Sequence, residues 1–145
     1  MKLDVIGYRI KKAEFINDML PDTKLNLQIQ MSHQIKVPNE FGPKSVGSVI
    51  TKVMVGTPLQ PLYIFMEQVT NFGDVEHDPA TKMDSDESMS IFKMICMPVA
   101  IEKVEENLNK LCQIYSIPAI KLQKTPPKED KNYESNIRLK KNPLN

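Results

Sequence analysis

The stretch LNLQIQMSHQIKV, residues 25–37, decides the fold because apolar and polar side chains alternate along its whole length. Its odd positions are apolar except for His33, and its even positions are polar. Successive side chains of a strand point to opposite faces of a sheet, so this period predicts one buried and one solvated face. At about 3.3 Å per residue the strand is on the order of 40 Å long, and a broad layer must therefore cover its buried face.

Three more long strands are predicted around this one. In residues 3–16 the apolar parity changes near Lys11, which predicts a β-bulge that bends or twists the strand. Residues 46–55 are rich in β-branched side chains, and 62–75 begin with a run that is apolar on both faces and predicts cover on both sides. Because the connections are short, we expect an antiparallel meander in which each strand pairs with the next.

The pattern becomes helical after the fourth strand. Asp84 followed by Glu87 is typical of a helix N-terminus, and a short apolar stripe continues until Pro98 interrupts the helix. A second helix is predicted over about 98–116, where apolar residues recur at spacings of three and four. Strands followed by helices indicate an α+β fold, here a four-stranded, long antiparallel meander sheet with a short and a long helix on one face.

Composition divides the chain into a domain and a tail. With 145 residues, 41% hydrophobic and 26% charged, the sequence is typical of one globular domain, which we expect over 1–123. Residues 124–145 carry six Lys and Arg against three Asp and Glu, which predicts a basic, disordered tail. No apolar run is long enough to cross a membrane and no apolar leader follows Met1, so we expect a cytoplasmic protein without membrane insertion.

No sequence motif indicates catalysis, a metal site or a cofactor. Cys96 and Cys112 lack the close spacing of zinc or redox motifs, which predicts free thiols packed in the core. His33 has only the distant His77 as a second histidine, so we expect it to be structural or interfacial. Without a glycine-rich phosphate loop or a basic stripe interleaved with aromatics, the sequence favours neither an enzyme nor a nucleic-acid-binding protein.

The nine methionines are the remaining signal in the composition. They are spread through every predicted element, with Met19 and Met97 at junctions between elements. Any one of them is ordinary core filling, because the flexible thioether suits irregular gaps. Together they indicate a protein that offers soft, adaptable apolar surface to another chain.

The order and spacing of these elements resemble the SecB family of export chaperones over residues 3–123. In the strands, the resemblance is carried by Tyr8-Arg9-Ile10, Phe15, Lys24-Leu25-Asn26-Leu27 and Phe72-Gly73. In the helical part, it is carried by Ile95-Cys96-Met97-Pro98-Val99-Ala100 and Ile117-Pro118-Ala119-Ile120-Lys121-Leu122. The resemblance implies a homotetramer, built as a dimer of dimers, whose apolar grooves hold non-native polypeptides without ATP.

Several features depart from the family's pattern. Val99 and Ile101 follow Pro98 where the family has tyrosine and soon arginine, and the connection 17–23 is shorter than the family's crossover loop. The family's closing Asn-Phe is missing as well. The polar face of the second strand lacks the acidic residues that bind the translocase motor in the family, so the resemblance does not imply this partner. In their place stand Asn26, Gln28, Gln30 and Lys36.

Two hypotheses of function follow. The first is a holdase that binds unfolded or nascent polypeptides, either in protein export or for a dedicated client. From their positions at loop and helix junctions, we expect its peptide-binding residues to be Met19, Leu20, Phe41, Phe72, Met94 and Met97. The second is a structural or adaptor protein of the same fold that binds one specific folded partner.

Overall fold

The computed structural model describes residues 1–22 and 24–124 together with the backbone of 131–138. The elements are, in chain order, β1 (Leu3–Asn17), β2 (Lys24–Lys36), β3 (Glu40–Phe41), β4 (Val46–Gly56), β5 (Leu62–Asp74), β6 (Met83–Asp84), α1 (Ser85–Ile91), the π-helical turn η1 (Phe92–Cys96), α2 (Met97–Ile114) and β7 (Lys131–Arg138). The four long strands predicted from the sequence are β1, β2, β4 and β5, and each lies close to its predicted range.

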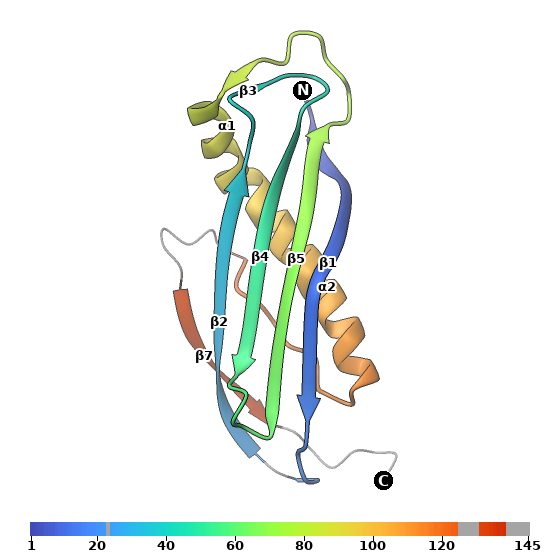
Figure 1. Cartoon of the computed structure of the whole chain (residues 1–145), viewed down its shortest axis with the longest axis vertical. Coiled ribbons are helices and arrows are strands. Elements are labelled where there is room, and N and C mark those ends of the chain that lie inside the picture. The colour runs from blue at the N-terminus through green and yellow to red at the C-terminus, as the bar shows by residue number, and fades with distance from the viewer. Residues whose placement is uncertain (23, 125–130, 139–145) are drawn as a thin grey trace.

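One antiparallel sheet dominates the molecule, with the strand order β1-β5-β4-β2-β7. Figure 1 shows α2 running diagonally across one face of this sheet. The short strands β3 and β6 form a separate pair, and α1 packs against them at one end of the molecule. The predicted α+β fold of long antiparallel strands followed by helices is therefore confirmed, with α2 as the helix that covers the sheet.

The predicted meander is wrong for the first strand. β1 pairs with β5, from Leu3 opposite Asp74 to Asn17 opposite Leu62. Among the four long strands, therefore, the second pairs with the third (β2 with β4) and the third with the fourth (β4 with β5), but the first does not pair with the second. Strands three positions apart lie about 14 Å apart, and six residues span up to about 20 Å, so a short connection does not force neighbours to pair. The connection passes the β4–β5 turn, where the Asp18 N–H donates to the Pro61 carbonyl oxygen at 2.7 Å.

The helical segment is continuous through Pro98. The Glu87 N–H donates to Asp84 Oδ1 at 2.8 Å, which confirms the predicted N-cap of α1. Proline lacks an N–H and its ring clashes with the preceding turn, which predicted an interruption. Instead, η1 widens the helix before Pro98, with the Met97 N–H donating to the Phe92 carbonyl five residues earlier. No helix in the described part of the chain is long and apolar enough to span a membrane.

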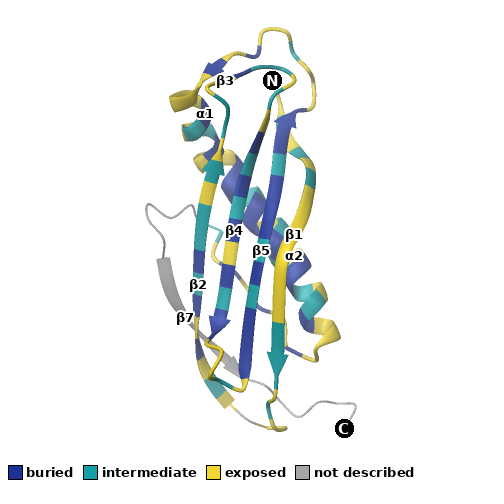
Figure 2. Cartoon of the chain, in the orientation of Figure 1, coloured by how far each residue is buried: buried dark blue, intermediate teal, exposed yellow. Residues whose placement is uncertain are grey.

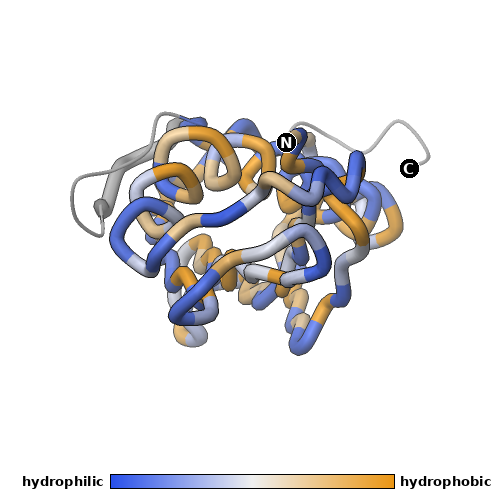
Figure 3. The backbone as a smooth tube through the Cα atoms, turned by 90° about the horizontal axis from the view of Figure 1, so that it is seen from above, coloured by the Kyte–Doolittle hydropathy of each residue, from blue (hydrophilic) through white to orange (hydrophobic). Residues whose placement is uncertain are grey.

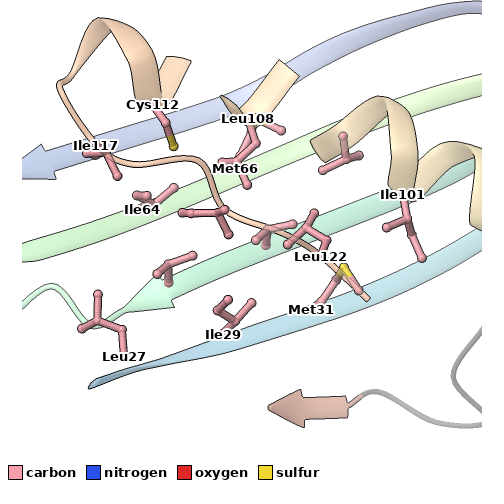
Figure 4. Packing of buried hydrophobic residues seen from close by; sticks show 14 of the residues in the cluster. Leu27, Ile29, Met31, Ile64, Met66, Ile101, Leu108, Cys112, Ile117 and Leu122 are labelled. Atoms are coloured by element: carbon pink, nitrogen blue, oxygen red, sulfur yellow. The ribbon is translucent and has the colours of Figure 1, made fainter. Parts of the chain in front are cut away.

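Two apolar clusters fill the space between the sheet and the helical segment, and buried residues concentrate on β4, β5 and α2 (Figure 2). The lower cluster, drawn in part in Figure 4, joins these strands to α2 and to the segment that follows it. Its buried members are Leu27, Ile29, Met31, Val53, Val55, Leu62, Ile64, Met66, Met97, Ile101, Val104, Leu108, Cys112, Ile117, Ile120 and Leu122. Those of the upper cluster are Phe41, Val49, Phe72, Met83, Phe92, Cys96 and Ala100.

A row of polar side chains lies between the two clusters, and we call it the polar belt. Gln68 Nε2 donates to Thr70 Oγ1 at 3.3 Å, and Asn107 Nδ2 of α2 donates to Gln68 Oε1 at 2.9 Å. On the neighbouring strands, His33 Nδ1 and Thr51 Oγ1 lie 3.3 Å apart. Buried polar groups are tolerated where they find hydrogen-bond partners. The contact of His33 with Thr51 fits the structural role predicted for this histidine.

The predicted tail, 124–145, falls mostly outside the described residues. Lys124 and the backbone of 131–138 are described, and 125–130 and 139–145 are not. Residues 131–138 form β7, which pairs with β2, and the disorder expected for 124–145 as a whole stays a prediction. The segment reads KNYESNIR, in which apolar residues at 133 and 137 lie among polar ones.

Candidate polypeptide-binding surface

Three of the residues predicted to bind peptide lie in the core. Phe41, Phe72 and Met97 are all buried. The rings of Phe41 and Phe72 both meet the ring of Phe92 edge to face, with centroid distances of 5.7 and 6.0 Å. The positions of Phe41 and Phe72 beside junctions indicated exposure, but both rings pack with Phe92 in the buried aromatic cluster. These three side chains therefore offer no surface to another chain in this structure.

The other three predicted residues lie nearer the surface but not together. Leu20 is 75% exposed in the β1–β2 connection, and Met94 is 69% exposed on η1. Met19 is half-buried and packs against the lower cluster. Figure 1 shows the β1–β2 connection and the α1 end of the helical segment at opposite ends of the molecule. The predicted residues thus do not form one site.

A continuous apolar stripe lies instead along β1, on the face that α2 covers elsewhere in the sheet. Pairing places Tyr8 opposite Thr70 and Ile10 opposite Gln68, and Gln68 bonds to α2, which fixes this face. Beyond a register shift at Lys11, the same face continues; we call the whole stripe the β1 track, made of Tyr8, Ile10, Ala13 and Phe15. The bulge predicted near Lys11 is thereby confirmed, and it keeps these side chains on one face.

The β1 track is open to solvent along much of its length. Tyr8 is 50% exposed and Ile10 is 39% exposed, while Phe15 is half-buried. At its lower end, the ring of Phe15 stacks on Tyr115 at a centroid distance of 5.2 Å, and Asn17 Nδ2 donates to the Tyr115 carbonyl oxygen at 2.9 Å. Figure 3 shows the backbone from above, coloured by hydropathy, with hydrophobic and hydrophilic stretches lying close to one another. The partly exposed side chains of Tyr8 and Ile10 are surface that an extended apolar segment can cover.

A hollow lies near the N-terminal end of β1. It has a volume of about 300 Å³ and is lined in part by Ile6, Val46 and Val75, all three exposed. The side chain of Ile6 lies over Gly73, where an added Cβ would come within 3.3 Å of Ile6 Cδ1. The described residues contain no group of three or more His, Cys, Asp or Glu side chains that could hold a metal ion.

The two cysteines are buried and free, as predicted. Cys96 belongs to the upper cluster and Cys112 to the lower cluster. Burial raises the pKa of both thiols to about 12, because the apolar surroundings disfavour the thiolate. Neither thiol is placed to act as a nucleophile at neutral pH.

Sequence reasoning missed the exposure of the β1 track. The alternation of Tyr8 and Ile10 indicated a buried face, which would hold for an interior strand. The signal that could have corrected it is the run of Arg9, Lys11 and Lys12, because edge strands are often marked by charges. β1 is one of the two edge strands of the sheet in the described part of the chain.

The fold that these elements define is that of the SecB-like chaperones. Its architecture is similar to that of Rv1957 from Mycobacterium tuberculosis, a SecB-like chaperone whose structure is known in complex with a ChAD peptide from the Rv1956 HigA1 antitoxin. The TM-score is 0.57 at 11% sequence identity, and the match covers 83% of this chain and 86% of that chain. The likeness is therefore one of fold. No protein-family model and no curated protein sequence matches the chain.

Proposed function

We propose that this chain is a chaperone that holds extended, non-native polypeptide segments on exposed apolar surface, without ATP or catalysis. The observation that carries the proposal is the β1 track, which presents Tyr8 and Ile10 to solvent on an edge strand. The similarity of fold to a chaperone bound to a peptide supports it. Leu20, beyond the lower end of β1, extends the proposed surface.

The track suits clients of many sequences. Burial of apolar surface is non-directional and stabilises by about 25 cal/mol per Å², so it selects for hydrophobicity and not for one sequence. No strand that the structure describes pairs with the outer edge of β1, so this edge adds backbone donors and acceptors that any extended chain can use. From Tyr8 to Phe15 the strand rises by about 23 Å, which is room for roughly seven residues of an extended client.

The test compares Ile10→Asp with Leu59→Asp in full-length protein. Leu59 is 97% exposed on the β4–β5 turn and is not one of the track residues, so it is a matched control for placing a charge at an exposed apolar position. The readout is the light scattering of chemically denatured citrate synthase during refolding. We expect wild type and Leu59→Asp to suppress scattering and Ile10→Asp to need at least about tenfold more protein, because a charge replaces an apolar contact. Equal suppression by all three proteins would contradict the role of the track.

We also propose that the chain forms a homo-oligomer, with a dimer of dimers as the arrangement. Among the described strands none pairs with the outer edge of β1, and this edge with the apolar side chains beside it supports self-association, since an unprotected edge readily pairs with another strand. Multi-angle light scattering with and without unfolded client measures the mass directly. A monomer at micromolar concentration in both conditions would contradict this part of the proposal.

A dedicated partner is the second candidate. The peptide bound to Rv1957 comes from one named antitoxin, which favours a single client over a general pool. A pull-down from the source organism distinguishes the two. One stoichiometric partner would favour an adaptor or dedicated chaperone, and many substoichiometric partners would favour the general holdase.

We place this activity in the cytoplasm, where thiols are kept reduced. The support is that Cys96 and Cys112 are both free and lie in separate clusters. Fractionation of cells that express the tagged chain tests the placement.

A further inference from the structure

The first half of β2 extends past its neighbour in the sheet. β2 pairs with β4 only from Ile29 onward, where Ile29 lies opposite Val55. Within the part of the chain that the structure describes, residues 24–28 pair with β7 alone. We call residues 24–28 the β2 overhang. Figure 1 shows β7 beside this lower part of β2, at the opposite edge of the sheet from β1.

A polar hollow of about 450 Å³ lies beside the β2 overhang. It is lined by the amide side chains of Asn26, Gln28 and Gln30 and by Leu27 of β2, and by Gly56, Thr57 and Gln60 at the β4–β5 turn. Amides both donate and accept hydrogen bonds, so they accommodate polar side chains of many kinds. The opposite face of the overhang is apolar. It carries the half-buried Leu25 and the buried Leu27, and it continues into Ile29, just beyond the overhang, in the lower cluster.

The register of β7 matches these two environments. Tyr133 lies opposite Ile29 and Ile137 opposite Leu25, while Glu134 lies opposite Gln28. In this register two apolar residues four apart lie opposite apolar positions of β2, with Ser135 between them opposite Leu27, and Glu134 lies opposite an amide residue. This is the pattern of a strand added to an exposed edge, where backbone bonds give affinity and alternate side chains give selectivity.

We propose that the β2 overhang is a second client-binding site, occupied in cis by β7, and that an extended client binds there by replacing β7. The inference rests on the proposed function only in taking the client to be an extended polypeptide. A segment with apolar residues at i and i+4 and polar residues between them fits the site. Because the tail is tethered close to its site, it competes at high effective concentration, and clients bind weakly until it leaves.

The experiment locks and releases β7 in the full-length chain. Gln28→Cys with Glu134→Cys places two cysteines directly opposite each other, at a separation that a disulfide can bridge. Cys96 and Cys112 are buried, so they do not compete for oxidation. For release, Ser135→Pro with Asn136→Pro removes the N–H groups of two successive residues, one of which serves the ladder. Lys141→Pro with Asn142→Pro, beyond β7, is the control.

Binding is measured by fluorescence anisotropy of a labelled synthetic peptide with the sequence of residues 129–140. If β7 is docked nine-tenths of the time, release raises the apparent affinity about tenfold. We expect the double-proline protein to bind at least fivefold more tightly than wild type and its control. The oxidised lock should bind at least tenfold more weakly than the same protein after reduction, whereas the single-cysteine variants should not respond to reductant.

The outcomes separate this inference from the proposed function. If all variants bind the peptide equally while wild type still suppresses aggregation, the exchange at β2 is wrong and the holdase remains. If oxidation leaves peptide binding unchanged, the overhang is not the site. If the proline variant forms stable dimers through β2, the edge serves a second copy of the chain and the client proposal is overturned. If Ile10→Asp abolishes suppression but not peptide binding, the two sites are distinct, as proposed.

Discussion

At the scale of single residues, the Asp74 carboxylate organises the connection between β5 and β6. It accepts hydrogen bonds from the N–H groups of Lys2, Glu76 and Asp78 at 3.0–3.1 Å and from Thr81 Oγ1 at 2.7 Å. Burial disfavours its charge, but these bonds outweigh burial and hold the pKa of Asp74 well below its ordinary value. These bonds favour the ionised form, in which both oxygens accept hydrogen bonds and neither carries a proton.

The sign of the resulting pH dependence follows from the lowered pKa. A depressed carboxyl pKa stabilises the fold above the unfolded value of about 3.9, and this contribution is lost as pH falls toward the folded value. We expect Asp74→Asn to lower the urea midpoint at pH 7 and to flatten the loss of stability below about pH 4. Urea unfolding of both proteins from pH 7 to pH 2 measures it. Parallel curves over that range would contradict the role of Asp74.

At the scale of elements, β4 and the helical segment approach each other at Gly47. A Cβ built there would lie 2.3 Å from Cζ of Phe92, whose ring is fully buried in the upper cluster. The close approach therefore requires glycine, and the ring of Phe92 connects η1 to Phe41 and Phe72. This contact fixes the upper end of the helical segment on the sheet.

Gly47→Ala should therefore destabilise the fold by about 1–3 kcal/mol, the usual cost of overpacking a core. The control is Gly7→Ala in β1, where an added Cβ meets nothing within 4 Å. That substitution should leave the stability unchanged or raise it by up to about 1 kcal/mol, because alanine loses less backbone conformational entropy on folding than glycine does. Denaturant unfolding gives both values. A Gly47→Ala protein as stable as the control would show that the ring moves aside freely.

The sequence predicts the elements better than their arrangement. The alternation of 25–37, broken only at His33, and the N-cap at Asp84 are local signals, and both elements form as predicted. Pairing of β1 with β5 is non-local, and a connection as short as 18–23 is compatible with more than one strand order. The core position of Phe41 depends in the same way on β3 pairing with β6, which no local pattern indicates.

At the scale of the whole molecule, each apolar cluster contains one cysteine. Cys96 reports on the upper cluster and Cys112 on the lower, and both are closed to solvent in the folded state. Because α2 contributes residues to both clusters and to the polar belt between them, we expect the domain to unfold as one cooperative unit.

Thiol labelling tests this cooperativity. In Cys96→Ala and Cys112→Ala proteins, the remaining thiol should react with a maleimide only on unfolding, since burial raises its pKa to about 12 and blocks access. We expect both labelling transitions to coincide with the loss of circular dichroism in urea, after correction for each variant's stability. Labelling of one cysteine well before the other would show that the two ends unfold separately.

The hydrogen bond between Asn107 and Gln68 fixes the position of α2 along the strands. A slide of α2 by one turn, about 5.4 Å, would carry Asn107 away from Gln68 and leave an amide unsatisfied among apolar side chains. The helix therefore has one permitted position along the strands. Tyr115 lies eight residues after Asn107. The position that this bond sets for α2 therefore also sets where Tyr115 stacks on Phe15 at the lower end of the β1 track.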